Sequence, residues 1–505
     1  MKRKTWTATP LLAGLLALVL AAPPVFAAED EPKHDMSDQA KILEVDPVAE
    51  NWFGPEPRYD DQPYDAEKQL DIYGKKFMNK TAKPPIDLGI RMYDRGAYTP
   101  RATWLGQKNP INFHFMTYGD VRVAGASYNG GSGEQSVLAA RLNLDMDLAI
   151  TATERLHAFV RPIDNGKSFT RYQIRGPDEG KFIHESNFDL KTLFFEGDVG
   201  SIAQGFTNRI NQLDIPFALG RVPLFTQNGI WLDDAFDGVA TGITAKNSPR
   251  LDISNTDITF FAGLRGVTTG ASPLTDNSNK VFGLAGFVDA RKGYFEYGYG
   301  FTSAKDSDLS YHNLTAAFSR RYKGRLSNSV RVIGNFGQKG IAGQKTADGA
   351  LLLIENSIIP RYFPYGSKFT VLNFVPYVNL FAGFDSPQPL ARAVDSGGVL
   401  KNTGINFESD GLTAYPTLDA TAKKSYGGAL GVEYLFDLSR QLVFEAAAVQ
   451  RMGSVTPGNG NQYAFGARYQ HKIGNAWIVR ADAMKGWRQG QKDIYGVRLE
   501  IRRKF

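Results

Sequence analysis

The chain of 505 residues contains no cysteine. A protein without cysteine has no disulfide scaffold and no Cys-x-x-Cys-His site for covalent haem attachment. Beyond its N-terminal segment, the sequence also has no run of eighteen or more apolar residues, which a membrane-spanning helix requires. The fold must therefore be stabilised by backbone hydrogen bonding and packing, without disulfides or a bundle of apolar helices.

Motifs for catalysis and cofactor binding are absent as well. The sequence has neither a Gly-x-Ser-x-Gly nucleophile elbow nor a Gly-x-x-x-x-Gly-Lys-Ser/Thr phosphate loop. Its six histidines are scattered between His34 and His471 without metal-ligand spacing. We therefore predict that the chain is not an enzyme and has no catalytic residues, metal site or cofactor.

Basic residues exceed acidic residues only slightly, and the formal net charge is +6. Lys2, Arg3 and Lys4 precede an apolar stretch at 11–22, and residues 25–27 offer a cleavage site. We expect residues 1–27 to be a signal peptide and the mature chain to begin at Ala28. Removing three basic and no acidic residues lowers the charge from +6 to +3. This small excess does not indicate a nucleic-acid partner.

The C-terminal third contains a regular alternation of apolar and polar side chains. In residues 495–505 one row is Tyr495, Val497, Leu499, Ile501 and Phe505, broken by Arg503, and the other is Gly496, Arg498, Glu500, Arg502 and Lys504. A period of two places successive side chains on opposite faces of a strand. The same pattern occurs in residues 426–437, 442–451, 463–473 and 477–487.

The polar row of these strands must face water. In residues 138–150, seven alternate apolar residues oppose a row containing Arg141, Asp145 and Asp147. Burying such a charged row in a packed core would be prohibitively costly. Connections between the last strands also alternate between short turns, at 437–440 and 474–476, and longer loops, at 452–461 and 488–492. This rhythm is typical of a transmembrane β-barrel with periplasmic turns and external loops.

Two resemblances follow from these residues. An alternating last strand that ends in Phe505 resembles the C-terminus of bacterial outer-membrane porins. That resemblance implies a bacterial outer-membrane location, contact with membrane lipid and recognition of Phe505 by the barrel-assembly machinery. Residues 217–239 resemble the hairpin with a Gly-Arg-Gln-x-Leu signature in alginate-export-type barrels, although Val222 replaces the glutamine. The second resemblance implies a polysaccharide-conducting barrel of eighteen strands with Arg221 in its lumen.

We predict an all-β fold, an antiparallel up-and-down transmembrane barrel in residues 110–505, with eighteen strands and sixteen as the alternative. Residues 28–109 precede it as a periplasmic extension or plug-like arm that could bind a periplasmic partner. The thirteen further strand candidates are residues 111–123, 138–150, 156–164, 188–199, 215–224, 236–246, 252–265, 281–290, 293–301, 311–322, 328–337, 350–359 and 369–384. Pro376 should bend, bulge or shorten the last of these.

Two long connections, residues 165–187 and 385–424, interrupt the alternation of strands and turns. Loops of this length are often functional. Each could fold inward as a constriction or gate, or remain outside as a cap.

Charged residues on the inward rows should determine which ions enter the pore. The predicted pore-lining residues are Arg141, Asp145, Asp147, Arg221, Arg265, Arg321, Arg331, Glu433, Glu445, Arg468, Arg480, Asp482, Arg498, Glu500 and Arg502. Arginines outnumber carboxylates in this set, which predicts a mild preference for anions. The alternative is that these arginines pair with the neighbouring carboxylates and brace the wall.

Three functions are compatible with this pattern. The first is an outer-membrane channel that passes hydrophilic, preferably anionic solutes. The second is an exporter of an anionic polysaccharide, as in alginate-export-type barrels. The third is a barrel sheath that holds a cytochrome or lipoprotein partner. The sequence leaves the transported solute and the oligomeric state open.

Overall fold

The computed structural model describes residues 82–89, 102–165, 168–270, 278–340, 345–358, 374–393, 396–409, 411–437, 439–454 and 460–505. The expected signal peptide lies outside these ranges, as does most of the expected extension, residues 28–109. Within the described part of that extension, β1 (Ile86–Gly89) pairs antiparallel with the start of β2, and Ala102 forms an isolated bridge with Ile111.

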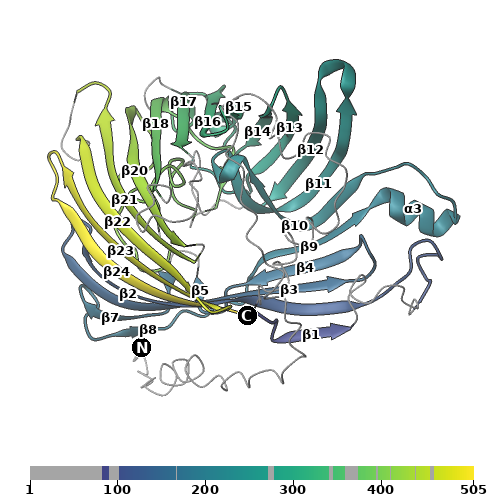
Figure 1. The fold of residues 1–505 in the computed structure, drawn as a ribbon, viewed down its shortest axis with the longest axis horizontal. Coiled ribbons are helices and arrows are strands. Elements are labelled where there is room, and N and C mark those ends of the chain that lie inside the picture. The colour runs from purple at the N-terminus through teal and green to yellow at the C-terminus, as the bar shows by residue number, and fades with distance from the viewer. Residues whose placement is uncertain are drawn as a thin grey trace, which may run out of the picture. The chain divides into compact units, whose positions relative to one another are not determined.

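Eighteen antiparallel strands in the described ranges form a closed barrel (Figure 1). In order around the barrel they are β2 (His114–Asn129), β3 (Glu134–Ala149), β4 (Arg155–Val160), β9 (Leu190–Asp198), β10 (Pro216–Thr226), β11 (Leu232–Ser248), β12 (Ile253–Arg265), β13 (Lys280–Ala290), β14 (Gly293–Ser303), β15 (Tyr311–Tyr322), β16 (Leu326–Phe336), β17 (Asp348–Ile358), β18 (Phe374–Ser386), β20 (Ser425–Asp437), β21 (Arg440–Arg451), β22 (Gln462–Ile473), β23 (Trp477–Arg488) and β24 (Ile494–Lys504).

Closure comes from the pairing of β24 with β2, which runs from Asp120↔Lys504 to Asn129↔Tyr495. Each of the other strands pairs with the next strand in that order. The prediction of an all-β barrel with eighteen strands is confirmed, and the alternative of sixteen is wrong.

The two ends of the barrel differ in the length of their connections. At the end that contains Phe505, Arg291 and Lys292 connect β13 to β14, and both have positive φ angles, as a two-residue hairpin turn requires. The same end carries α3 (Val199–Thr207), which Asp198 caps by accepting a hydrogen bond from Ser201 N. Figure 1 shows α3 beyond the ends of β9 and β10. No helix in the described part of the chain is long and apolar enough to cross a membrane.

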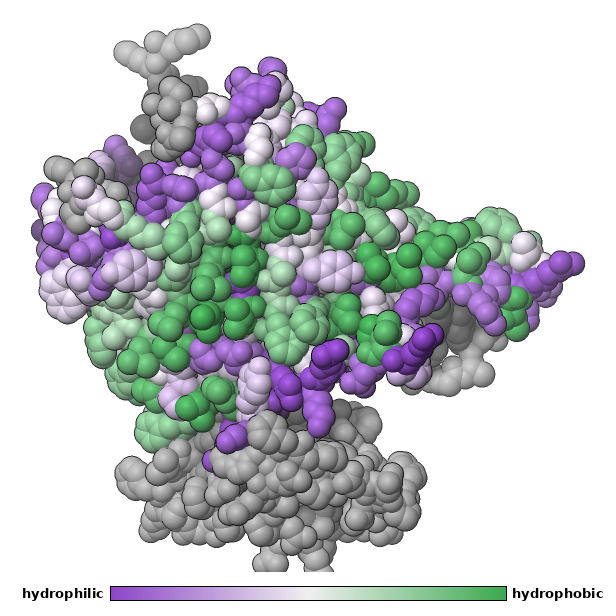
Figure 2. All heavy atoms as spheres, turned by 90° about the horizontal axis from the view of Figure 1, so that it is seen from above, coloured by the Kyte–Doolittle hydropathy of each residue, from purple (hydrophilic) through white to green (hydrophobic). Residues whose placement is uncertain are grey.

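The outward rows of the strands are apolar and exposed. Leu430, Val497 and Leu499 expose 63%, 58% and 51% of their surface. Figure 2 shows apolar residues gathered across the middle of the visible face, with hydrophilic residues above and below this band. A contiguous apolar surface of this kind is unfavourable in water but favourable against hydrocarbon. The outside of the barrel is therefore suited to lipid.

Pro376 lies near the start of its strand. In the described chain β18 begins at Phe374, two residues earlier, and the predicted residues 369–373 lie outside the described residues. The register between β18 and β20 continues through Pro376 without a shift.

Candidate functional site

The connection between β18 and β20, residues 387–424, folds into the lumen. We call it the inward segment; residues 394, 395 and 410 within it lie outside the described chain. Its short strand β19 (Ala391–Arg392) pairs in parallel with Leu232 and Asp233 of β11. At its other side, the Tyr415 hydroxyl donates a hydrogen bond of 2.9 Å to the carbonyl of Gly496 on β24. The segment therefore crosses the lumen, and of the two sequence-based alternatives for 385–424 the inward one is confirmed.

An apolar cluster holds one side of the inward segment. We call this cluster the apolar anchor; its strand and loop residues include Trp231, Phe236, Ile333, Leu351 and Leu353, and its segment residues include Leu390, Leu400 and Phe407. All eight are at most 1% exposed. Trp231 also donates from Nε1 to Asn313 Oδ1 over 2.8 Å, so its only polar atom is satisfied. This side of the lumen is packed like the interior of a soluble protein.

Arg392 provides a polar attachment beside the apolar anchor. Its guanidinium donates to the carbonyls of Gly229 and Gly398, and to Ser396 O at 3.4 Å. Burial lowers the pKa of Arg392 to about 10, although the nearby Asp233 carboxylate opposes this shift. The side chain thus remains charged at neutral pH and stays bonded to four backbone carbonyls, the fourth being Gly397 O at 3.4 Å.

Glu445 on β21 provides a second attachment. Its carboxylate is 1% exposed and accepts hydrogen bonds from the segment, from Ile405 N at 2.8 Å and from Asn406 N at 2.9 Å. Asn406 Nδ2 donates to it over 2.9 Å, and the Tyr377 hydroxyl over 2.6 Å. The predicted pore-lining residue Glu445 therefore lies under the inward segment and fixes its backbone.

Glu408 of the inward segment bonds to the charged wall opposite the apolar anchor. Arg468 donates to one oxygen of Glu408 over 2.6 Å, and Arg480 donates to the other over 3.1 Å. Burial alone would raise the pKa of Glu408, but the two guanidinium groups outweigh it and lower the pKa below its ordinary value of 4.5. Glu408 is therefore ionised at neutral pH and clamps the segment to β22 and β23.

The wall behind Glu408 forms a chain of ion pairs. Asp482 contacts three arginines, Arg468 at 2.7 Å, Arg480 at 2.9 Å and Arg498 at 3.0 Å. Glu500 then pairs with Arg498 and, at 2.8 Å, with Arg502. Asp120 and Arg122 on β2 pair at 2.6 Å. We call these eight residues and Glu408 the charged cluster.

The charged cluster contains five arginines (122, 468, 480, 498 and 502) and four carboxylates (120, 408, 482 and 500), a formal balance of +1. The sequence-based alternative, in which the wall arginines pair with neighbouring carboxylates, describes this cluster well. What the sequence did not reveal is that one of those carboxylates comes from the inward segment.

A polar cavity of about 500 Å³ lies beside the charged cluster. Its charged lining residues are the cations Arg122, Arg141, Arg161, Lys401, Arg480 and Arg502 and the carboxylates Asp120, Asp145, Asp233, Glu408 and Glu500. Six cations against five carboxylates leave a formal charge of +1. Most of the arginines are engaged in ion pairs, but no carboxylate among the described residues pairs with Lys401, so its ammonium group is available to a solute.

The structure brings most of the predicted pore-lining residues into two neighbouring groups. Arg141, Asp145, Arg480, Glu500 and Arg502 line the cavity. Arg468, Asp482 and Arg498 stand behind it in the charged cluster. All of them lie on β3 and β22–β24, which are close around the barrel because β24 closes onto β2.

The remaining predicted residues lie elsewhere. Arg331 is 2% exposed between Glu355, at 3.1 Å, and Glu296, at 3.6 Å. Asp147 pairs with His157 at 3.1 Å. Arg265 and Arg321 are exposed and Glu433 is half-buried.

Arg221 shares its alternating row on β10 with the exposed Leu219. Its Nε donates to Lys191 O over 3.0 Å, and its Nη1 lies 3.7 Å from Asp237. These contacts give no support to a lumen role carried over from alginate-export-type barrels.

Several cavity residues were not predicted. Asp120 and Arg122 alternate with Val121 and Val123, so the period of two could have identified them. Lys401 and Glu408 belong to the inward segment, which has no periodic pattern. Only the tertiary contacts of the segment reveal these two residues.

The connection between β4 and β9 extends the wall through its strand β7, as far as its described residues show. It contains β5 (Asp164–Asn165), β6 (Ser168–Phe169), β7 (Arg171–Arg175) and β8 (Phe182–Ile183). β7 pairs with the end of β3 that the short β4 leaves free.

Arg141 joins this extension to the inward segment. It forms an ion pair with the buried Asp164 and donates to Gly411 O over 2.5 Å. In the predicted loop 165–187, Phe169 packs against the apolar cluster that includes Leu412 of the inward segment, so the loop supports that segment from the side.

Comparison with known proteins shows the fold of this chain. No protein-family model and no curated protein sequence matches it. The solved structure of OpdK from Pseudomonas aeruginosa with vanillate is 11% identical, with a TM-score of 0.50, and the match covers 77% of this chain and 98% of that one. OccK5 (OpdH) from the same organism is also 11% identical, with a TM-score of 0.49 and coverage of 77% and 98%.

OccK2 (OpdF) from the same organism, in complex with glucuronate, is 12% identical, with a TM-score of 0.48 and coverage of 77% and 96%. At these identities the likeness concerns the fold alone. None of these matches is to an alginate-export-type barrel, so that resemblance gains no support. The chain has a closed antiparallel β-barrel fold similar to that of OpdK.

Proposed function

We propose that this chain is a bacterial outer-membrane channel that passes small hydrophilic solutes and prefers anions. The observation that carries the proposal is the polar cavity of about 500 Å³ between the charged cluster and the inward segment. Sites for small molecules usually enclose roughly 300–1,000 Å³. The cavity is therefore suited to a solute of a few tens of atoms and not to a polymer coil.

The charges around the cavity support an anionic solute. The cations exceed the carboxylates by one, and Lys401 is held by none of the described carboxylates. Arg122 and Arg502 already donate to Asp120 and Glu500, so the ammonium group of Lys401 is the donor best placed to meet a carboxylate of the solute. The similar barrel OpdK was solved with vanillate, a carboxylate, which agrees with this choice of solute.

The inward segment favours a channel over the two other functions. It crosses the lumen from β11 to β24 and is attached on both sides. A sheath must leave room for a folded partner, and a polysaccharide exporter needs a continuous wide passage. The segment occupies the space that either of these functions would need.

Ion selectivity in planar lipid bilayers tests the proposal. With a KCl gradient across the bilayer, the purified protein should give a zero-current potential of the sign that anion preference produces. Lys401→Gln should shift this potential toward zero because it removes a cavity charge that no ion pair neutralises. Arg503→Gln is the matched control, since Arg503 lies outside the lumen over the Trp477 ring, 5.5 Å from its centroid.

The solute class is tested in the same bilayers. Millimolar vanillate should interrupt the current, whereas its uncharged methyl ester should not. A cation preference, or interruption by both compounds alike, would overturn the anionic assignment. Absence of any current from correctly folded barrels would overturn the channel itself.

A further inference from the structure

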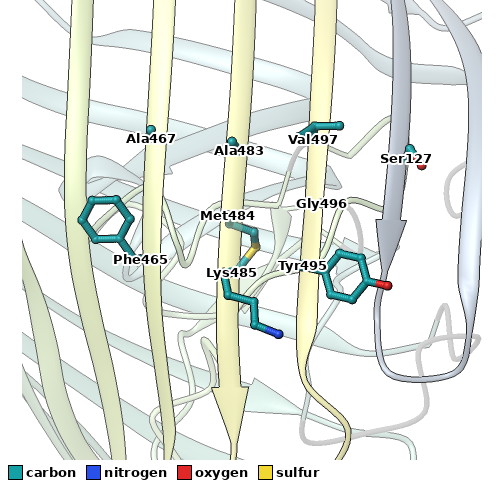
Figure 3. A pocket seen from close by; sticks show the side chains of 9 residues that line it. All are labelled: Ser127, Phe465, Ala467, Ala483, Met484, Lys485, Tyr495, Gly496 and Val497. Carbon is teal, nitrogen blue, oxygen red and sulfur yellow. The ribbon is translucent and has the colours of Figure 1, made fainter.

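The outward face of the last strands contains a hollow of about 450 Å³ (Figure 3). It lies over β22, β23, β24 and β2, on the opposite side of the wall from the charged cluster. Its floor includes Ala467, Ala483, Val497 and Ser127, which share outward rows with exposed residues such as Leu499. Small side chains in four neighbouring strands therefore leave a depression in the lipid-facing surface.

Three large side chains border the hollow toward the loop between β23 and β24. They are Phe465, Lys485 and Tyr495, and Figure 3 shows Lys485 extending between the two strands toward Tyr495. This loop is at the end opposite Phe505, which is the external end of the barrel. A hydrocarbon chain that enters from the outer leaflet would pass these side chains and reach the apolar floor.

Lys485 is held in place at this border. Its Nζ lies 5.3 Å from the ring centroid of Tyr495 and 6.0 Å from that of Trp487. It also pairs with Asp493 in the loop at 2.9 Å. The two rings and the carboxylate fix the ammonium group at the border of the hollow, and the side chain is still 41% exposed and open to a further anion.

Further charges surround Lys485 at the same end. Arg488 donates to the carbonyls of Lys492 and Gly130, and Tyr495 donates to Glu134, which pairs with Arg175. We call Lys485, Arg488, Lys492 and Arg175 the basic collar. Against its four cations stand two carboxylates, Asp493 and Glu134, which leaves a formal charge of +2 next to an apolar hollow.

We propose that the hollow binds an acyl chain of a phosphorylated membrane lipid of the outer leaflet, with a phosphate of that lipid on the basic collar. An apolar slot with cations at its interfacial end matches the two parts of such a lipid. An isologous contact with a second copy of this chain would instead set two basic collars against each other. The inference rests on the membrane location in the proposed function and not on conduction.

Native mass spectrometry of the full chain in detergent, with added bis-phosphorylated lipid A, tests the inference. The unaltered protein should retain one lipid. Ala483→Trp fills the hollow and should lower retention by about tenfold, whereas Lys485→Gln should lower it by roughly three- to tenfold, because acyl burial and phosphate attraction both contribute. Dephosphorylated lipid A should bind the unaltered protein about as weakly as lipid A binds Lys485→Gln.

Two controls match these variants. Ala481→Trp adds the same ring on the same outward row but outside the hollow, and Arg503→Gln removes an outward cation at the opposite end of the barrel. Both should retain lipid A within about twofold of the unaltered protein, since neither touches the hollow. Heat-dependent migration on gels shows that each variant still forms a closed barrel.

Equal retention by all variants would overturn the inference. A change from a larger assembly to single chains in Ala483→Trp, without a change in lipid retention, would assign the hollow to a second copy. Conductance should be unchanged in Ala483→Trp and Lys485→Gln because both face away from the lumen. A barrel that binds lipid but carries no current would thus refute the channel and leave the lipid site standing.

Discussion

The two sides of the lumen bind the same inward segment by different interactions, apolar packing on one side and ion pairs on the other. On the apolar anchor, Trp231, Leu390 and Leu400 are fully buried. On the opposite side, Glu408 bonds to Arg468 and Arg480 next to an open polar cavity. Burying a large apolar side chain contributes about 1.5–3 kcal/mol, whereas the cost of desolvating buried ion pairs offsets much of their mutual attraction. The difference indicates that the apolar side positions the segment and the charged side selects the solute.

If the apolar anchor positions the segment, Trp231→Ala should have the largest effect. Removing a fully buried indole costs about 3–5 kcal/mol and leaves Asn313 Oδ1 without its donor. We expect a lower unfolding temperature, and larger, noisier single-channel currents as the segment loosens. Trp487→Ala, on the exposed outward row, is the control and should leave the current unchanged. Wild-type currents from Trp231→Ala would refute the anchoring role.

Glu445→Gln should have the next largest effect. The substitution replaces one carboxylate oxygen by an NH₂ group, which faces the N–H donor of Ile405 or Asn406 and cannot accept its hydrogen bond. A buried donor without an acceptor costs about 1–3 kcal/mol. We expect faster proteolysis of residues 398–409 in the folded barrel, measured by mass spectrometry of the fragments. Glu433→Gln, on the neighbouring strand and only half-buried, serves for comparison. Identical cleavage rates in both variants would argue against the attachment.

Asp482→Asn tests the charged side. The negative charge of Asp482 offsets part of the positive charge of three arginines. Its removal therefore raises the net charge of the charged cluster from +1 to +2. The zero-current potential in a KCl gradient should move further toward that of a pure anion channel. Destabilisation should be smaller than for Trp231→Ala because each of the three arginines keeps Glu408 or Glu500 as a partner. A shift toward cations would show that the charged cluster does not govern selectivity.

The smallest effect should be a pH dependence of the Glu408 clamp. The pKa of Glu408 is lowered from 4.5 by Arg468 and Arg480 against the effect of burial. A carboxyl group with a lower pKa in the folded than in the unfolded state adds stability above the unfolded pKa and loses it as the pH falls through the folded pKa.

Single-channel noise should therefore be constant from pH 7 to about pH 5 and rise below about pH 4. Glu408→Gln should give the same noise at all these pH values. If the noise of the unaltered protein rises already near neutral pH, another group is responsible.

The strands could be predicted because every one of them separates lipid on its outer face from water on its inner face. Each of the eighteen predicted segments overlaps a strand of the barrel, and errors are confined to the ends. The largest error concerns β2, which was expected at 111–123 but runs from His114 to Asn129. Ile111 belongs to the same alternation but forms a bridge with Ala102 and not a barrel pair.

The alternation of apolar and polar side chains is weaker in strands whose inner row packs against the inward segment. On β16 and β17 the inward residues Ile333, Leu351 and Leu353 are as apolar as the outward ones. A strand with two apolar faces loses its period of two, so its boundaries and its inner row are harder to identify. The strand residues of the charged cluster were easier to predict because the inner rows of their strands are polar and the outer rows apolar.

By itself, the sequence determined that this protein is a closed barrel with an apolar outside, because lipid outside and water inside impose an alternation that any short window records. It also placed Arg141, Arg480, Glu500 and Arg502 on the inner row. Only the tertiary structure decided that residues 387–424 cross the lumen and that Glu408 and Lys401 meet those residues there. Contacts between a loop without a period and strands far away in the chain leave no local signal in the sequence.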